Sequence, residues 1–186
     1  MSIKISKIIL NEIEQILSKV NDEEINNFIS TIIKNKKNKI VCAGAGRVGN
    51  AIWAFSMRLG HLGFNSYCIG DSTTPSIKKG DLLIVASGSG ETETIYHLVK
   101  VAKNHMVNIA LITGNKDSRM GHLSDITAVI PAPSKTRKIE GFKSIQPMTT
   151  LNEQCLNIFF DTVVIELMRK MKIKEKHMWD RHSKLE

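Results

Sequence analysis

The sequence has few aromatic residues and few cysteines. Phe, Trp and Tyr make up 5% of the 186 residues, so the core must be built mainly from aliphatic side chains and methionine. Cys42, Cys68 and Cys155 are odd in number and have no C-x-x-C spacing, which excludes a fully paired disulfide framework. Two of them lie in apolar, strand-like runs, where a buried free thiol is the usual explanation. Free thiols indicate a reducing compartment.

Long hydrophobic runs are also missing. No apolar run approaches the roughly 20 residues that cross a bilayer. The N-terminal stretch is interrupted by Lys4, Lys7, Glu12 and Glu14, which is typical of an amphipathic helix and not of a signal peptide. We therefore expect a cytoplasmic protein that does not act at a membrane.

Acidic residues are outnumbered by basic ones. The chain has 26 Lys and Arg against 18 Asp and Glu, a formal charge of +8, and this balance favours anionic partners. The densest basic stretch, residues 34–39, has no interleaved aromatic side chains on which bases could stack. We expect a phosphorylated small molecule as the partner and no nucleic acid.

The apolar residues follow a helical period at both ends of the chain and form short strand-like runs between them. Strands that alternate with helices predict an α/β fold with a parallel sheet covered on both faces. We expect one domain over residues 1–186: a pair of helices (2–35) with Asn21 or Asp22 as the N-cap between them, a core (39–171) and a C-terminal tail (172–186), in which residues 179–186 have no periodicity. Within the core, the expected strands are 39–43, 66–69, 81–86, 107–113 and 126–130, and the expected helices are 47–62, 91–104, 120–123 and 150–171.

The first glycine loop (residues 44–49) follows a strand and opens a helix. Its sequence, Gly44-Ala45-Gly46-Arg47-Val48-Gly49, matches the G-x-G-x-x-G pattern of dinucleotide sites, and Asp71 ends the next strand where a ribose-binding acid would lie. However, no chain remains for the substrate domain of a dehydrogenase. The fixed charge of Arg47 also suits a terminal phosphate or carboxylate better. We therefore favour a phosphate ligand for Gly44, Gly46 and Arg47 over a dinucleotide.

The second glycine loop (residues 87–92) follows an apolar strand and precedes another helix. Its sequence is Ser87-Gly88-Ser89-Gly90-Glu91-Thr92. Glycines let the backbone approach an anion closely, and three hydroxyls and the first N–H groups of the helix can converge on a phosphate. The alternative is that Ser89 only N-caps the helix, but a cap does not explain the alternation of serine and glycine. We predict that all six residues form a phosphate-binding loop.

The two glycine loops are expected to face one ligand. In open α/β sheets, ligands bind beyond the carboxyl ends of the strands, and both loops leave the predicted sheet there. Residues 72–75 join the same rim. The basic loop from Pro131 to Gln146 is too long for a simple connection, which often indicates function.

These motifs together resemble the sugar isomerase (SIS) domain family, and within it the branch of the 6-phospho-3-hexuloisomerases. The likeness runs in family order over nearly the whole chain. Val48, where relatives commonly have serine, and Thr149, where they usually have glycine, depart from the family pattern. The matching segments are residues 44–47, 57–64, 73–75, 87–92 and 146–148, with Thr150, Glu153, Arg181, His182 and Leu185.

The resemblance implies a three-layer αβα sandwich with a five-stranded parallel sheet, doubly wound as in flavodoxin, and a homotetramer. It implies isomerisation of D-arabino-3-hexulose 6-phosphate to fructose 6-phosphate through an enediolate, without a metal or cofactor, in functional pairing with 3-hexulose-6-phosphate synthase. Two alternatives stay open: another SIS isomerase of sugar phosphates, and a non-catalytic sugar-phosphate sensor. The N-terminal helices lack the clustered arginines of a DNA-binding motif.

Glu153 is the candidate catalytic base. It begins an apolar helical stripe and should therefore point along a buried face. Residues 150–153 also read as a capping box, in which Thr150 and Glu153 would satisfy backbone N–H groups at a helix start. The resemblance favours the catalytic role over the capping role.

His61 and His182 are the candidate acids. His61 falls in the last turn of its helix, where the helix dipole favours the charged imidazolium. The alternative for His61 is a surface histidine without a role. His182 lies in the tail, where a lone histidine is normally inert, but the resemblance implies that the tail folds over an active site, its own or a neighbour's.

Overall fold

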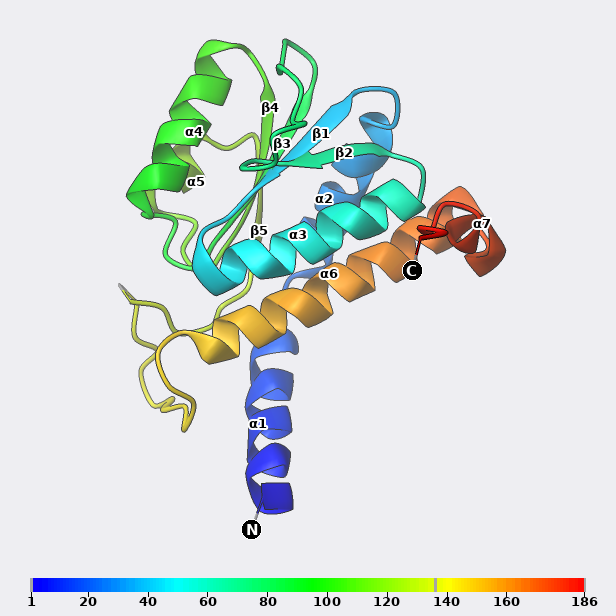
Figure 1. Cartoon of the computed structure of the whole chain (residues 1–186). Coiled ribbons are helices and arrows are strands. Elements are labelled where there is room, and N and C mark those ends of the chain that lie inside the picture. Colours follow the sequence, from blue (N-terminus) through cyan, green and yellow to red (C-terminus); the bar gives the residue numbers. More distant parts are fainter. Residues whose placement is uncertain (1, 136, 186) are drawn as a thin grey trace.

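A five-stranded, entirely parallel sheet forms the centre of the computed structural model (Figure 1). The structure describes residues 2–135 and 137–185; Met1 and Glu186, the limits of the predicted domain, lie outside them, as does Thr136. The strand order is β2-β1-β3-β4-β5, which confirms the predicted α/β fold with a flavodoxin-like, doubly wound sheet. The strands are β1 (Lys39–Ala43), β2 (Asn65–Cys68), β3 (Leu82–Ser87), β4 (Asn108–Thr113) and β5 (Ile126–Val129).

Helices cover both faces of the sheet. One face packs against α2, α3 and α6, with the second half of α1 behind them, and the other face packs against α4 and α5. The first half of α1 projects from the body (Figure 1). The helices are α1 (Ser2–Leu17), α2 (Asp22–Lys34), α3 (Gly46–His61), α4 (Glu93–Asn104), α5 (Arg119–Leu123), α6 (Thr150–Met171) and α7 (Glu175–Trp179).

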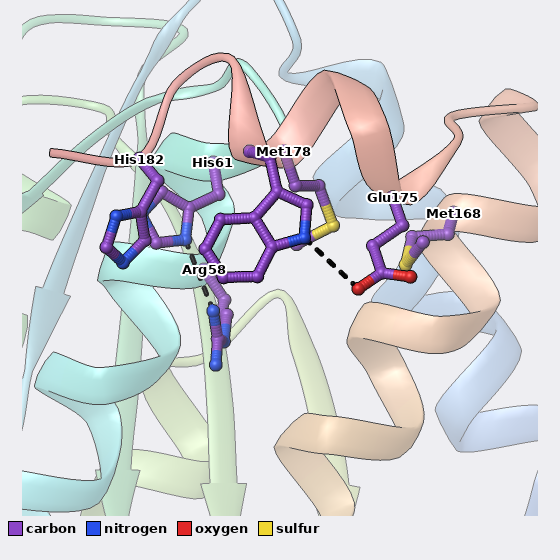
Figure 2. A pocket seen from close by; sticks show the side chains of 7 residues that line it. Arg58, His61, Met168, Glu175, Met178 and His182 are labelled. Atoms are coloured by element: carbon purple, nitrogen blue, oxygen red, sulfur yellow. Dashed lines mark hydrogen bonds between the residues drawn. The ribbon is translucent and has the colours of Figure 1, made fainter. Parts of the chain in front are cut away.

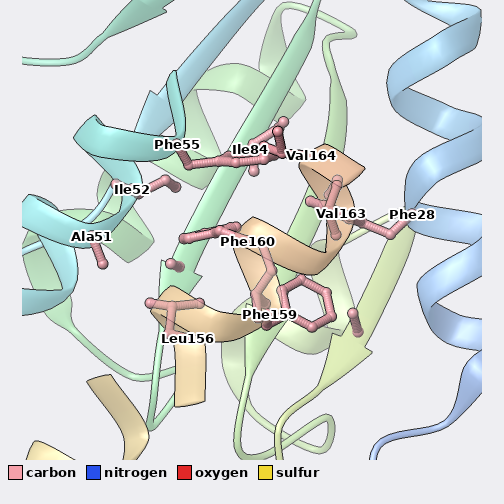
Figure 3. Close-up of a cluster of buried hydrophobic side chains, with 14 of the residues drawn as sticks. Phe28, Ala51, Ile52, Phe55, Ile84, Leu156, Phe159, Phe160, Val163 and Val164 are labelled. Atoms are coloured by element: carbon pink, nitrogen blue, oxygen red, sulfur yellow. The ribbon is translucent and has the colours of Figure 1, made fainter. Parts of the chain in front are cut away.

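Phenylalanine side chains join α3 and α6 in the larger core (Figure 3). Phe55 of α3 stacks on Phe160 of α6 with 4.3 Å between ring centroids, and Phe159 packs on Phe28 of α2 at 5.8 Å. Four of the six phenylalanines thus lie at the junction of three helices, while aliphatic side chains fill most of the rest of the core. This packing keeps α3 and α6 side by side in the same direction, with their N-termini at one end (Figure 1).

The predicted elements agree with the structure to within about two residues, except in the tail. The Asn21 side chain accepts hydrogen bonds from the backbone N–H groups of Glu23 and Glu24, which confirms the N-cap between α1 and α2. The tail contains a short helix, α7, that was not predicted; it ends at Trp179, where the stretch without periodicity begins. A single helical turn is too short to show periodicity in a sequence, and here Trp179 Nε1 supports it by donating to Glu175 Oε1 (3.2 Å).

Candidate active site

The two glycine loops leave neighbouring strands at the carboxyl edge of the sheet. β1 and β3 are adjacent, and the chain continues from β1 through α3 to β2 on one side and from β3 through α4 to β4 on the other. This is the point where the strand order reverses, at which open α/β sheets bind their ligands. The fold therefore brings both predicted loops to one place.

The first glycine loop needs its glycines for two different reasons. Gly46 has a φ of +58°, which favours glycine, and a methyl group on Gly49 would lie 2.9 Å from the carbonyl oxygen of Gly44. The N-cap residue Ala45 offers no capping side chain, so the first N–H groups of α3 stay available to an anion. Arg47 donates from Nε to the carboxylate of Glu153, and its side chain is 67% exposed.

The second glycine loop brings two of its three hydroxyls together. Ser87 Oγ lies 3.1 Å from Thr92 Oγ1 and also accepts a hydrogen bond from the N–H of Gly90 (3.2 Å). Ser89 instead accepts from the N–H of Glu91 in a local turn (3.2 Å). The alternative in which Ser89 caps the helix is wrong, because α4 begins at Glu93 with Thr92 at the N-cap.

Glu91 points toward α5 and not toward the centre of its loop. Its carboxylate accepts hydrogen bonds from the N–H (2.8 Å) and the Nε (2.5 Å) of Arg119, and Arg119 Nη2 donates to the Glu91 carbonyl oxygen (3.1 Å). The hydrogen bonds from Arg119 lower the pKa of Glu91. Arg119 thus neutralises the one acid of the loop and fixes the loop backbone, a role that the sequence patterns did not reveal.

The first turn of α6 closes the space between the loops. Glu153 is only 8% exposed; its Oε1 accepts a hydrogen bond from Thr149 Oγ1 (3.0 Å), and its Oε2 pairs with Arg47. The predicted capping box is wrong, because Thr149 is the N-cap residue of α6 and the Thr150 hydroxyl donates to the carbonyl oxygen of Pro147 (2.8 Å). The Glu153 side chain is therefore turned toward the first glycine loop.

A buried acid of α1 anchors the long loop before α6. The carboxylate of Glu12, 5% exposed, accepts hydrogen bonds from Ser144 Oγ (2.6 Å), the N–H of Ile145 (2.8 Å) and Gln146 Nε2 (3.0 Å). Burial raises the pKa of Glu12, whereas the three hydrogen bonds lower it. Together the hydrogen bonds outweigh burial, so the pKa of Glu12 lies below its usual value. Glu12 thus holds the segment that leads into the first turn of α6.

His61 and His182 meet at the opposite end of α3 (Figure 2). His61 is 8% exposed, so the alternative of a surface histidine is wrong. Its ring lies 5.4 Å from the ring of His182, and Arg58 Nη1 is 3.4 Å from its Nδ1. The tail therefore folds onto His61 within the same chain. Both histidines line a pocket of about 390 Å³ together with Arg58, Met168, Glu175, Met178 and Trp179.

One chain does not bring the three predicted catalytic side chains together. Arg47, which contacts Glu153, and His61 are the second and the last residue of α3. At a rise of 1.5 Å per residue, the two positions are about 21 Å apart along the helix. Glu153 and the histidine pair thus form two separate clusters at opposite ends of the α3–α6 pair.

A family model for the SIS domain matches residues 32–158, a stretch that includes β1–β5, both glycine loops and Glu153. The chain belongs to the SIS domain family. The 3-hexulose-6-phosphate isomerase of Bacillus subtilis is 36% identical over 96% of this chain and 95% of its own length. The 3-hexulose-6-phosphate isomerase of Methanocaldococcus jannaschii is 40% identical over 89% of this chain and 87% of its own length.

Solved structures show the same SIS architecture. A Methanococcus jannaschii protein, whose crystal structure led to an inferred function of 3-hexulose-6-phosphate isomerase, superposes with a TM-score of 0.80 at 36% identity. The match covers 98% of this chain and 97% of that protein. On these similarities the chain is an isomerase of the SIS family, as the sequence predicted.

Neither a metal site nor a membrane segment emerges from the described part of this SIS domain. Within residues 2–135 and 137–185, no cluster of three or more His, Cys, Asp or Glu side chains could hold a metal ion. In the same residues, no helix is long and apolar enough to cross a membrane.

Proposed function

We propose that this SIS isomerase interconverts D-arabino-3-hexulose 6-phosphate and fructose 6-phosphate through an enediolate. The observation that carries the proposal is the buried carboxylate of Glu153, held at the rim where the two glycine loops meet. Support for this substrate comes from relatives named 3-hexulose-6-phosphate isomerase that are 34–40% identical over most of the chain.

The second glycine loop binds the phosphate. The Ser87 and Thr92 hydroxyls lie together at the N-terminus of α4, where unpaired N–H groups and the helix dipole favour an anion. Gly88, Ser89 and Gly90 let the loop backbone approach the phosphate, and Glu91 keeps the loop in place through Arg119. Loops of this composition bind phosphate dianions through several short, charge-assisted hydrogen bonds.

The first glycine loop supplies a fixed cation from the other side. Among the described residues only the Nε of Arg47 is bonded, so its two terminal nitrogens remain for an oxygen of the ligand. The backbone of Gly44 and Gly46 borders the same space. Arg47 also orients the carboxylate of Glu153, as a positioned base requires.

Glu153 moves the proton between C2 and C3. Its carboxylate removes the proton from C2, the electrons of that bond form the C2–C3 double bond, and the C3 carbonyl oxygen takes up a proton from an acid. The resulting enediol loses the proton of its C2 oxygen, and Glu153 returns its proton to C3. The carbonyl thereby moves from C3 to C2 without any net change in composition.

A second copy of the chain supplies the acid from His61 and His182. Those histidines lie about 21 Å along α3 from Arg47 in their own chain, too far to reach the same two carbons. A two-fold axis that crosses α3 midway would place the histidine cluster of each chain over Glu153 of the other. The exposed face of α3 at that midpoint carries Trp53 and Met57, 46% and 55% exposed, which suits a self-complementary interface.

A further apolar surface accounts for the proposed homotetramer. The projecting half of α1 exposes Ile3, Ile5, Ile8 and Leu10. This surface is separate from the α3 face, and two different interfaces generate a tetramer, a dimer of dimers with closed symmetry. We further propose that the whole chain forms one SIS domain and works in the cytoplasm in functional pairing with 3-hexulose-6-phosphate synthase.

The decisive experiment couples the protein to that synthase with ribulose 5-phosphate and formaldehyde. Fructose 6-phosphate must appear at a rate that depends on the concentration of this protein. No product with an active synthase would overturn the proposed substrate. Binding of fructose 6-phosphate without turnover would identify a sensor, and turnover of an arabinose or heptulose phosphate alone would identify a different SIS isomerase.

A further inference from the structure

Asn152 is a polar residue in a buried position of the candidate active site. It precedes Glu153 in the first turn of α6 and is 4% exposed. A methyl group on Gly88 would lie 2.9 Å from Asn152 Oδ1 and 3.2 Å from its Cγ, so the carboxamide fills the space beside the second glycine loop. Ser87, Gly88 and Asn152 line the same crevice at the end of β3.

The Asn152 carboxamide has no hydrogen-bond partner among residues 2–135 and 137–185. In that part of the chain, Gln154 Oε1 is the only side-chain oxygen or nitrogen that is both fully buried and unpaired. The unpaired carboxamide atoms of Asn152 are therefore not fully buried and keep a small exposed surface. A polar side chain that loses most of its water without gaining a partner destabilises the protein. Packing alone would be served better here by an aliphatic side chain.

Two consecutive residues of α6 face the two glycine loops. Asn152 lies against Gly88 of the second loop, and Glu153 pairs with Arg47 of the first. Successive side chains of a helix point about 100° apart, so Asn152 and Glu153 can face different loops from the same helical turn. This turn of α6 therefore borders the space between the two loops. A sugar chain that runs from a phosphate at the second loop to Glu153 must pass Asn152.

We propose that Asn152 is a substrate-binding residue, whose carboxamide binds the hydroxyl groups between the phosphate and the reacting carbons. Its Nδ2 donates hydrogen bonds and its Oδ1 accepts them, a combination that matches a hydroxyl, which does both. Asn152 therefore distinguishes a sugar phosphate from a bare phosphate ion. This inference rests on the proposed function, since it assigns part of the same site.

The test compares Asn152→Ala with the matched control Asn104→Ala, an asparagine at the far end of α4. In Asn152→Ala, the KM for hexulose 6-phosphate should rise about tenfold, as expected for the loss of good hydrogen bonds. The inhibition constant of inorganic phosphate, which probes the second loop alone, should stay within about twofold. Asn104→Ala should change neither value. An unchanged KM in Asn152→Ala, or an equal loss of phosphate inhibition, would overturn the assignment.

Two further measurements keep this test independent of folding and of the proposed reaction. Asn152→Asp retains the shape of the side chain and replaces the Nδ2 donor by a charged oxygen, so it should raise the KM more than Asn152→Ala does; a normal KM would contradict the inference. If the wild-type protein does not turn over hexulose 6-phosphate, the proposed function fails.

In that case, calorimetry with fructose 6-phosphate and with inorganic phosphate tests the role of Asn152 by itself. If Asn152→Ala loses affinity for both ligands, or for neither, the assignment of Asn152 is overturned.

Discussion

The two ends of the α3–α6 pair carry different chemistry and are built in different ways. At one end, Glu153 is fixed by Arg47 and Thr149, and two glycine loops converge beside it. At the other end, His61 is covered by the last residues of the chain, with His182 packed against its ring. The first cluster can hold a phosphate and a base, and the second holds imidazoles and Arg58 in a pocket.

Under the proposed function, these two ends are the halves of one active site and are contributed by different chains. In the described residues, the Glu153 end combines a carboxylate with two glycine loops and is about 21 Å along α3 from His61. The His61 end holds two imidazoles in a pocket to which neither glycine loop contributes. An isomerase that relies on both halves depends on its assembly.

Removal of the base should have the largest effect on turnover. Glu153→Gln preserves the shape of the side chain and its bond from Thr149 but removes the proton acceptor, so kcat should fall about 10³-fold. Fructose 6-phosphate affinity, measured by calorimetry, should stay within a few-fold. The control is Glu166→Gln, which removes a carboxylate of α6 that pairs with Arg169 at the surface. Near-normal kcat in Glu153→Gln would remove Glu153 from its assigned role.

Mixing two inactive variants should restore activity if the halves come from different chains. Glu153→Gln and His61→Ala are each expected to be nearly inactive. After co-refolding in equal amounts, half of the dimers are mixed and each of those has one intact site, so about a quarter of the wild-type activity should return. Activity no higher than the sum of the separate variants would show that each chain works alone.

Loss of the brace behind the second glycine loop should affect binding more than chemistry. Arg119→Ala releases Glu91 and leaves its negative charge beside the phosphate, so the KM should rise about five- to tenfold with kcat within twofold. The double variant Arg119→Ala/Glu91→Gln should recover part of the affinity, because it removes the freed charge. A KM unaltered by Arg119→Ala would mean that the loop keeps its shape without the brace.

The smallest expected effect concerns Glu12 and pH. Its folded-state pKa lies below the usual value, so the stability that it contributes is present above about pH 4.5 and is lost as the pH falls through the folded-state pKa. The Tm difference between wild type and Glu12→Gln should therefore shrink from pH 6 to pH 4. Differential scanning calorimetry measures this difference. Glu14→Gln, an exposed change on the same helix, serves as the control. A Tm difference that is independent of pH would contradict the linkage.

The fold was largely predictable from the sequence, whereas the side-chain partners in the site were only partly so. Changes of period and the glycine loops marked all five strands, because both signals are local. Glu12 left a trace, since it occupies a position in the apolar stripe of α1. Arg119 and Asn152 left none, because their roles depend on which loops the sheet brings beside them. The separation of Glu153 from His61 required the direction of α6 relative to α3, which no local pattern contains.

The close fit between Gly88 and Asn152 ties two distant positions of the chain together in evolution. A side chain at position 88 would occupy the volume that Asn152 already fills, so a substitution there is accepted only after position 152 has become smaller. Homologues with a smaller residue at position 152 have room for a side chain at position 88, so the sizes of the two residues should covary across the family.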